Sequence, residues 1–463
     1  MNGTDWKPGF EGSDQPLYVW LSRSISNDIE RGVLSAGTRL PTHRYMADLL
    51  GVAVGTVTRA YTEAERRGLI RSEGRRGTFV GPPQTSRSIL SAMARSSAHG
   101  VDLSKNHPSN HLDPDLGGAI RRIAREKEVQ ALLEYPPAAG MERHREAGAR
   151  WLNQLGAVAD PESIFISAGA QHALAVIFAA ETRRGDITAA ENLTYPGVKA
   201  VAEQFDLQVV GIPTDQQGLI PEAFETICHQ KSVRLLYCNP SVSNPTNTFS
   251  SLTRREHIAA VAEKYHVTIV EDEIMRPLLP EHPGFIADLL PEQTYLVISA
   301  SKAVAAGLRI GFVRAPAKSH QKMVDSLNAS CLGVPPLMAE LFSTWLEDGT
   351  IDSIVARRRS DTAVRQKLAT ELLAGFRHRG HPVSYHVWLE LPEGWTGMKL
   401  AHEAQARGTS VTPAEAFAVD NRSPVNAVRL SLVMPPTLDQ LKGGLKTIVD
   451  LLRGNAGHEM ATV

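Results

Sequence analysis

The strongest constraint on the fold is a pattern that begins at Val101 and continues through most of the chain. Short runs of β-branched and apolar residues alternate there with longer stretches of helical spacing. Such alternation is typical of an α/β domain with a mostly parallel sheet, and we expect one over residues 101–455. The predicted strands are Ser163–Ser167, Leu207–Ile212, Val233–Cys238, Val267–Glu271, Thr294–Ser299 and Leu308–Val313.

The first eighty residues follow a different pattern, in which apolar residues recur at helical spacing. Thr42 is a predicted helix N-cap, and Leu69–Val80 predicts a β-hairpin. We therefore expect a winged helix-turn-helix over residues 14–80, mainly α-helical with a β-wing, followed by a linker over residues 81–100. The positions with helical spacing are Leu17, Leu21, Ile25 and Ile29, then Met46, Ala47 and Leu50, then Val57, Ala60, Tyr61 and Ala64.

Arginine gathers in this region, although the net charge of the whole chain is −1. Residues 39–80 hold eight arginines, no lysine and four acidic residues, which gives the segment a charge of +4. A local basic patch is a weak electrostatic sign of DNA binding, but charge alone favours a solvated helix surface. The order of elements favours a DNA-binding domain over a three-helix subdomain that binds nothing.

This region resembles the GntR-type winged-helix regulators. The resemblance is carried by the string LPTHRYMADLLGVAVGTVTRAYTEAERRGLI followed by GRRGTFV. Ala53 and Val54 depart from it, because the family commonly has Ser or Thr followed by Arg there. The resemblance implies binding to double-stranded DNA, and the expected contacts are Arg44, Thr56, Thr58, Arg59, Arg75, Arg76 and Gly77.

Polar residues and glycines follow the predicted strands of the larger domain. Open α/β sheets bind ligands beyond the C-terminal ends of their strands, so these residues are candidates for a site. Each has an ordinary explanation when taken alone, as a surface lysine, a capping aspartate or an Asn-Pro turn. The candidates are Gly169, Ala170, Tyr195, Asn244, Asp272, Ser299, Ser301, Lys302 and Arg309.

As an ordered set, these residues resemble the fold-type I aminotransferases, which use pyridoxal phosphate (PLP). The resemblance implies that Lys302 forms a Schiff base with PLP, that Asp272 pairs with the ring nitrogen and that Asn244 binds the phenolic oxygen. It also implies that Tyr195 stacks on the ring. The implied phosphate-binding residues are Gly169, Ala170, Gln171, Ser299, Ser301 and Arg309.

Two further residues extend the resemblance, and two depart from it. Tyr135 resembles the tyrosine that reaches the phosphate bound by the partner subunit, which implies a homodimer. Arg429 resembles the arginine that binds the carboxylate of an amino acid. Met275 stands where the family commonly has Tyr, and Asn247 stands where Asn-Pro-Thr is commonly followed by Gly.

A GntR-type domain followed by an aminotransferase-like domain resembles the MocR-type regulators over nearly the whole chain. This implies a PLP-dependent transcription regulator, not an enzyme, that senses an amine-bearing, amino-acid-like effector through aldimine exchange at Lys302. The strings AVG at residues 53–55 and EDEIMRP resemble regulators of ectoine use, which implies a diaminobutyrate-type effector. A genuine aminotransferase with an appended DNA-binding domain remains the alternative. A regulator whose second domain is only a dimerisation scaffold is a third hypothesis.

The three cysteines, Cys228, Cys238 and Cys331, form no CxxC pair. We expect no metal site and a reducing cytoplasmic location. The chain has no long uninterrupted apolar run, so we expect no membrane partner.

Overall fold

The computed structural model describes residues 6–8, 16–30, 33–35, 37–66, 69–72, 74–80, 100–108, 110–419 and 425–459. The chain divides into two compact units, Met1–Ala92 and Met93–Val463. Apart from Gly100, the predicted linker lies outside the described residues. The predicted limits of the two domains, 14–80 and 101–455, stay predictions.

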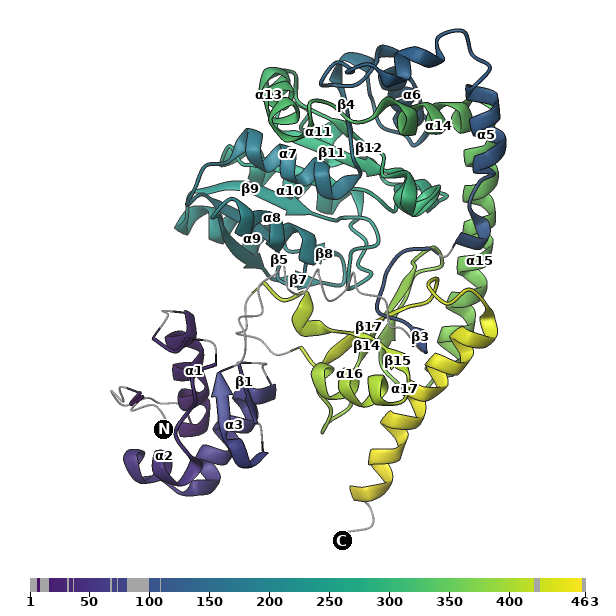
Figure 1. Cartoon of the computed structure of the whole chain (residues 1–463). Helices are drawn as coiled ribbons and strands as arrows, with labels where there is room; N and C mark the ends of the chain where they lie inside the picture. Colours follow the sequence, from purple (N-terminus) through teal and green to yellow (C-terminus); the bar gives the residue numbers. More distant parts are fainter. Residues whose placement is uncertain are drawn as a thin grey trace. The chain divides into compact units, whose positions relative to one another are not determined.

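The described residues of the first unit form three α-helices and a two-stranded antiparallel hairpin with a 3-10 turn, Gly74–Arg76, between its strands (Figure 1). Thr42 caps the second helix as predicted, because its side chain accepts a hydrogen bond from the main-chain N–H of Tyr45. Gly51 ends that helix in the left-handed conformation. The elements are α1 (Leu17–Glu30), α2 (His43–Leu50), α3 (Val54–Arg66), β1 (Ile70–Ser72) and β2 (Thr78–Val80).

One apolar core holds this unit together. The helical spacing correctly identified its α3 face, since Val57, Ala60, Tyr61 and Ala64 are all buried. They pack with residues of α1, α2 and the hairpin, so every element contributes to a single cluster. Burial of such side chains is the main source of stability in a domain of this size.

The second unit is built on a seven-stranded sheet with the order β4-β12-β11-β10-β9-β5-β6. Strands β11, β10, β9, β5 and β6 run parallel to one another, and β12 is antiparallel to both of its neighbours, β11 and β4. The prediction of a mostly parallel sheet is therefore confirmed. The strands are β4 (Ile164–Ser167), β5 (Ile187–Glu191), β6 (Gln208–Ile212), β9 (Val233–Cys238), β10 (Thr268–Asp272), β11 (Thr294–Ser299) and β12 (Gly311–Arg314).

Within this sheet, apart from one-residue shifts at strand ends, two details of the strand prediction were wrong. Strand β5 was missed because Ala189, Ala190 and Glu191 have little β-propensity, although burial between neighbouring strands makes them extended. The last strand begins at Gly311 and not at Leu308, because Leu308 ends a short 3-10 turn and Arg309 has a φ of 50°.

Helices cover both faces of this sheet (Figure 1). On one face, α7 and α8 pack with α13, and on the other α9 and α10 pack with α11. Helices α5, α6, α14 and α15 belong to a third part of the core. The bounds are α5 (Leu116–Ile123), α6 (Glu142–Gln154), α7 (Ala170–Glu181), α8 (Pro196–Gln204), α9 (Pro221–Gln230), α10 (Leu252–Lys264), α11 (Ile286–Leu289), α12 (Ala300–Ala303), α13 (His320–Cys331), α14 (Pro336–Glu347) and α15 (Thr350–Leu372).

A four-stranded sheet of order β13-β14-β17-β16 follows α15, with helices α16 and α17 packed into its core. The segment that starts at β3 pairs with β15, so residues 100–108 lie against the C-terminal part of the unit. The bounds are β3 (Val101–Asp102), β7 (Thr214–Asp215), β8 (Gly218–Leu219), β13 (His378–Arg379), β14 (His386–Glu390), α16 (Gly397–Ala406), β15 (Thr409–Ser410), β16 (Thr412–Pro413), β17 (Ala427–Ser431) and α17 (Leu438–Glu459).

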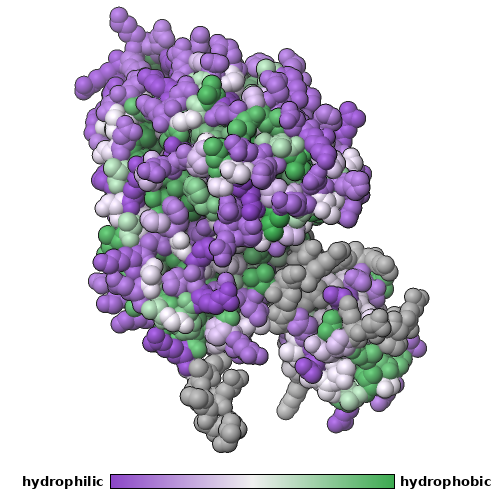
Figure 2. All heavy atoms as spheres, turned by 180° about the vertical axis from the view of Figure 1, so that it is seen from behind, coloured by the Kyte–Doolittle hydropathy of each residue, from purple (hydrophilic) through white to green (hydrophobic). Residues whose placement is uncertain are grey.

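On the face of the larger unit seen in Figure 2, hydrophobic residues are scattered among hydrophilic ones. Within the described ranges, no helix has the length and apolar character needed to cross a membrane. The same ranges contain no group of three or more His, Cys, Asp or Glu side chains arranged to hold a metal ion.

Candidate functional site

Lys302 lies in α12, directly after strand β11. Its Nζ contacts the main-chain oxygen of Asn106, and the hydroxyl of Tyr385 donates to the main-chain oxygen of Lys302 at 2.6 Å. Removal from water lowers the pKa of Lys302 to about 7, and the positive charges of Arg429 and Arg309 act in the same direction. A large fraction of this lysine is therefore neutral near pH 7, which is the nucleophilic form of an amine.

Asp272 ends strand β10 and is only 2% exposed. Its Oδ2 accepts a hydrogen bond of 2.7 Å from the hydroxyl of Tyr237, and its Oδ1 accepts one of 3.3 Å from the main-chain N–H of Ile274. Burial raises the pKa of Asp272 to about 6, and the bond from Tyr237 opposes this rise. The carboxyl group is thus held in one orientation close to Lys302.

Arg429 and Asn244 are paired with each other. One terminal guanidinium nitrogen of Arg429 donates to Oδ1 of Asn244 at 2.8 Å, and the other donates to the main-chain oxygen of Ser104 at 2.6 Å. The guanidinium carbon lies 4.9 Å from the ring centre of Phe417. Arg429 is 1% exposed, and burial lowers its pKa to about 9.

Tyr195 stands at the N-terminus of α8 and lies against Gly197. A Cβ at Gly197 would lie 2.2 Å from the Tyr195 ring and 2.1 Å from Oε1 of Gln171, so only glycine leaves room for both side chains. Gln171 in turn donates from Nε2 to the main-chain oxygen of Gly197 at 3.1 Å. Burial, followed by the negative charge of Asp272, raises the pKa of Tyr195 to about 12, so this hydroxyl stays protonated.

The predicted phosphate-binding residues come from two separate segments that meet at the N-terminus of α7. Arg309 donates to Oγ of Ser301 at 3.2 Å and to the main-chain oxygen of Ala168 at 3.0 Å. Gly169 has a φ of 83°, and a Cβ there would lie 2.7 Å from the Arg309 guanidinium. Ser299 Oγ accepts from the main-chain N–H of Ser301 at 3.2 Å. A helix N-terminus with an adjacent guanidinium is a favourable site for a phosphate group.

Several buried polar atoms around this cluster have no hydrogen-bond partner among the described residues, namely Oε1 of Gln171, Nε of Arg429, Oδ1 of Asn106 and Oε2 of Glu191. Buried polar atoms in proteins normally have a hydrogen-bond partner. The missing partners therefore indicate that atoms of a bound ligand make these hydrogen bonds. The residues present are an amine, an oriented carboxyl group, an anion-binding corner and a second guanidinium. This set fits PLP together with a carboxylate-bearing ligand.

In the first unit, the predicted DNA contacts lie mainly on exposed positions. Arg44, Thr58, Arg59 and Arg76 are exposed, and Thr56 is half-buried. The side chain of Arg75 lies outside the described part of the chain.

Three of these contacts also have intramolecular roles. The guanidinium of Arg59 lies 4.7 Å from the ring centre of Tyr18, and Thr58 donates to the main-chain oxygen of Val54 at 3.0 Å. Gly77 has a φ of 114°, and a Cβ there would lie 2.6 Å from Nε of Arg39, so the wing packs tightly at this glycine.

Residues 98–443 match the family "Aminotransferase class I and II", and residues 17–80 match "Bacterial regulatory proteins, gntR family". The chain belongs to the aminotransferase class I and II family. The GntR domain that precedes the aminotransferase-like domain gives it the MocR-type architecture. This confirms the family and the fold class that the sequence predicted, and it supports PLP as the cofactor of the aminotransferase-like domain.

Similar proteins include both regulators and aminotransferases. The uncharacterized HTH-type transcriptional regulator YdeF of Bacillus subtilis (strain 168) is 29% identical over 447 residues, which are 96% of this chain and 96% of YdeF. An archaeal alanine:glyoxylate aminotransferase covers 85% of this chain and 99% of its own, with a TM-score of 0.72 and 22% identity. LysN, the alpha-aminoadipate aminotransferase of Thermus thermophilus complexed with N-(5'-phosphopyridoxyl)-L-leucine, covers 79% of this chain and 97% of its own, with a TM-score of 0.70 and 23% identity.

Asn247 replaces the glycine that the family commonly has, and its conformation explains why an asparagine fits. Its φ is 56°, in the left-handed region that Asn tolerates better than other residues with a side chain. Its Nδ2 donates to the main-chain oxygens of Arg379 and His386 at 3.1 and 3.0 Å, and its Oδ1 accepts from Ser384. The side chain therefore ties the Asn-Pro-Thr-Asn loop to strands β13 and β14.

Met275, the second departure, is 5% exposed and belongs to the apolar core cluster beneath the site. Its neighbours in that cluster include Val242, Leu278 and Ile298. No hydroxyl is supplied from this position, which agrees with the sequence-based expectation.

Tyr135 does not lie with the other predicted site residues of the same chain. It is 86% exposed, and Leu133 beside it is 84% exposed. Two large exposed side chains on one short segment suit contact with a second subunit, which stays a prediction.

Sequence reasoning missed four residues of this site. Tyr237, Asn239 and Glu191 surround Asp272, and Asn106 contacts Lys302. Asn239 directly follows β9, so the rule that sites lie at strand ends could have found it. Tyr237 and Glu191 lie within predicted or missed strands, where an isolated polar residue gives no signal.

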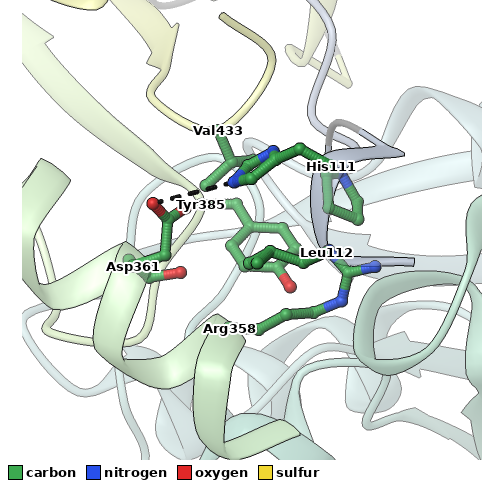
Figure 3. A pocket seen from close by; sticks show the side chains of 8 residues that line it. His111, Leu112, Arg358, Asp361, Tyr385 and Val433 are labelled. Atoms are coloured by element: carbon green, nitrogen blue, oxygen red, sulfur yellow. Dashed lines mark ion pairs between the residues drawn. The ribbon is translucent and has the colours of Figure 1, made fainter. Parts of the chain in front are cut away.

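A small pocket lies between α15 and the side chains of Pro108, His111 and Leu112 (Figure 3). Tyr385, whose hydroxyl binds the main chain of Lys302, lines it together with Arg358. Arg358 donates to the main-chain oxygens of Ala303 and Val304, and His111 lies 4.0 Å from Asp361. These contacts fix the end of α12 from the side of α15.

Proposed function

We propose that the chain is a PLP-dependent transcription regulator that binds double-stranded DNA and senses an amine-bearing, amino-acid-like effector. The observation that carries this proposal is the gathering of Lys302, Asp272, Asn244, Arg309 and Arg429 in a chain that also has a GntR domain. A scaffold that served only for dimerisation would not need an amine with a lowered pKa beside an oriented carboxyl group.

The residues that would hold PLP are those the sequence indicated. Lys302 would be the attachment point, Asp272 would pair with the ring nitrogen, Asn244 would bind the phenolic oxygen, and Tyr195 would lie against the ring. The phosphate group would be held by Arg309, Ser299, Ser301 and the N-terminus of α7 at Gly169, Ala170 and Gln171. When bound, PLP supplies an electrophilic aldehyde carbon to which primary amines add.

Arg429 is the expected binding site for the effector's carboxylate, because a guanidinium makes bidentate bonds to a carboxylate. Its Nε is free of partners among the described residues, and its pairing with Asn244 can be exchanged for a stronger ionic one. An effector with a primary amine near Lys302 and a carboxylate at Arg429 is an α-amino acid or a close analogue. Within this class we propose a diaminobutyrate-type compound.

The proposed mechanism is binding without efficient turnover. The amine of the effector would take the place of Lys302 at the cofactor, leaving the lysine as a free amine, and the effector would shift the aminotransferase-like domain only through different affinities for its two conformations. The apolar surroundings of Met275 support this, because no hydroxyl there can tune proton transfer at the reacting carbon.

The regulator acts as a homodimer in the cytoplasm, where its DNA is. In this arrangement Tyr135 would reach the phosphate group held by the partner subunit. Two DNA-binding domains linked in one dimer raise the effective concentration of the second domain once the first has bound.

The test is the absorbance spectrum of the purified full-length protein mixed with PLP, before and after addition of L-2,4-diaminobutyrate. We expect a visible band that changes with the amine, and borohydride reduction should place the label on Lys302. The Lys302→Ala variant is the control, and after borohydride reduction and removal of unbound PLP it should carry no covalent label. No visible band, or a label on another lysine, would overturn the cofactor assignment. Steady multiple-turnover transfer of the amino group to 2-oxoglutarate would favour an aminotransferase instead.

A further inference from the structure

The hydroxyl of Tyr237 donates a hydrogen bond to the carboxyl group of Asp272, at 2.7 Å from Oδ2. Tyr237 is 1% exposed and lies on β9, the strand that pairs in parallel with β10. With the Ile274 N–H on Oδ1, both oxygens of the carboxyl group have a donor from the protein. The hydrogen bond from Tyr237 therefore helps to fix the orientation of the Asp272 carboxyl group, including the oxygen lone pairs that accept no bond from the protein.

Glu191 is a second carboxyl group close to this pair. It ends β5, the strand on the other side of β9, and is 4% exposed. Its Oε2 has no hydrogen-bond partner among the described residues. Burial, followed by the negative charge of Asp272, raises the pKa of Glu191 to about 8, so Glu191 is mainly neutral at pH 7. Asp272 is then the carboxyl group that can carry the negative charge, and Tyr237 is a donor that favours this charged form.

We propose that Tyr237 is a positioning residue that keeps Asp272 ionised and aimed at the nitrogen of the cofactor ring. This inference rests on the proposed PLP site, and it adds a residue that the family motifs do not include in this chain. Tyr237 acts through Asp272 and touches neither PLP nor effector. Its hydroxyl remains protonated at physiological pH, because burial and the neighbouring carboxyl groups raise its pKa far above the usual value.

The chain contains a matched control in Tyr295. It lies on β11, is 0% exposed, and belongs to the same core cluster as Tyr237. Its hydroxyl also donates to a buried carboxylate, that of Glu181, at 2.8 Å. Replacing either tyrosine by Phe removes one hydroxyl and one bond to a carboxylate from the same core, but only Tyr237 contacts the predicted ring partner.

The experiment measures the dissociation constant and the absorbance spectrum of PLP in full-length wild type, Tyr237→Phe and Tyr295→Phe. We expect Tyr237→Phe to weaken PLP binding by about tenfold, the typical value of a hydrogen bond to a charged group, and to change the spectrum of bound PLP. Tyr295→Phe should match the wild type in both. In an Asp272→Asn background, Tyr237→Phe should have no further effect, because the charge it supports is gone.

A second variant preserves the shape of the side chain if Tyr237→Phe does not fold. Site-specific replacement of Tyr237 by 3-fluorotyrosine makes the hydroxyl a stronger donor, so the spectrum should change without loss of PLP affinity. Equal PLP affinity and equal spectra in wild type and both Tyr237 variants would overturn the inference. If the wild type itself binds no PLP, the proposed function fails first, and the two failures are thereby distinguished.

Discussion

Arg429 donates a hydrogen bond of 2.8 Å to the side-chain oxygen of Asn244, and so joins the predicted effector-binding residue to the predicted ligand of the ring oxygen. The two residues lie on strand β17 and in the loop after β9, 185 positions apart in the sequence. A carboxylate that binds Arg429 competes with this bond. Effector binding at Arg429, as proposed, would therefore change the hydrogen bonding and orientation of Asn244.

The first prediction concerns Arg429→Gln. An effector with a carboxylate should bind about tenfold more weakly or worse, since one charge-assisted contact is lost. L-2,4-diaminobutyrate and 1,3-diaminopropane, which lacks the carboxylate, form a matched pair of ligands. Titration followed by PLP absorbance should show a loss for the first and none for the second. An equal loss of affinity for both ligands would mean that Arg429 maintains the shape of the site and does not bind the carboxylate.

The second prediction concerns Asn247. Asn247→Gly keeps the left-handed backbone but removes the bonds to Arg379, Ser384 and His386, so we expect the free energy of unfolding to fall by about 1–3 kcal/mol. Asn247→Ala should lose roughly 1 kcal/mol more, because alanine is strained at a φ of 56°. Thermal unfolding of the three proteins checks the order. A variant with alanine as stable as the wild type would contradict the role given to this side chain.

The third prediction concerns pH. Because burial and neighbouring positive charges lower the pKa of Lys302 to about 7, its neutral form is lost as the pH falls through this value. The initial rate at which the apo-protein captures PLP should therefore rise between pH 6 and pH 8, with a midpoint near 7 instead of near 10.5.

Lys199 provides the comparison for this pH experiment. Burial lowers its pKa to about 8, but its Nζ donates to the main-chain oxygens of Ala416 and Ala418. Peptide mapping after borohydride reduction should find PLP on Lys302 and none on Lys199. A capture rate that keeps rising up to pH 10 would refute the lowered pKa.

The fourth prediction concerns DNA. Arg44→Ala and Arg76→Ala should each weaken binding of the full-length protein to a duplex selected from a random pool. Each should also reduce the slope of log affinity against log salt by about one, because each phosphate contact releases counterions. Arg125→Ala, an exposed substitution in the larger unit, is the control. Unchanged affinity and slope in both variants would remove the basis for the predicted interface.

Much of the fold could be predicted from local patterns. The α3 face and the Thr42 cap follow from helical spacing and hydrogen-bonding chemistry, which act over a few residues. Strand β5 could not be predicted in this way, because Ala189 and Ala190 become extended only through pairing with β6 and β9. The start of β12 was misplaced for a similar reason, since the left-handed φ of Arg309 is imposed by its contacts with Ala168 and Ser301.

The site residues divide in the same way, into those that local sequence patterns identify and those that depend on contacts between distant segments. The strand-end rule and the family motifs identified Lys302, Asp272 and Arg309, and the structure places them together. They gave no indication that Arg429 pairs with Asn244, or that Tyr237 bonds to Asp272, because both contacts join segments distant in sequence. In the sequence, Asn247 was only a departure from the family's Asn-Pro-Thr-Gly motif. In the structure, its side chain makes three hydrogen bonds that a glycine cannot make.

The most direct test of the account measures DNA affinity of the full-length protein with and without L-2,4-diaminobutyrate, in the wild type and in Lys302→Ala, both supplied with PLP. The account predicts that the amine changes the DNA affinity of the wild type, and that Lys302→Ala still binds the same duplex but no longer responds. An amine response that survives in Lys302→Ala, or none in a wild type whose PLP spectrum does change with the amine, would contradict it.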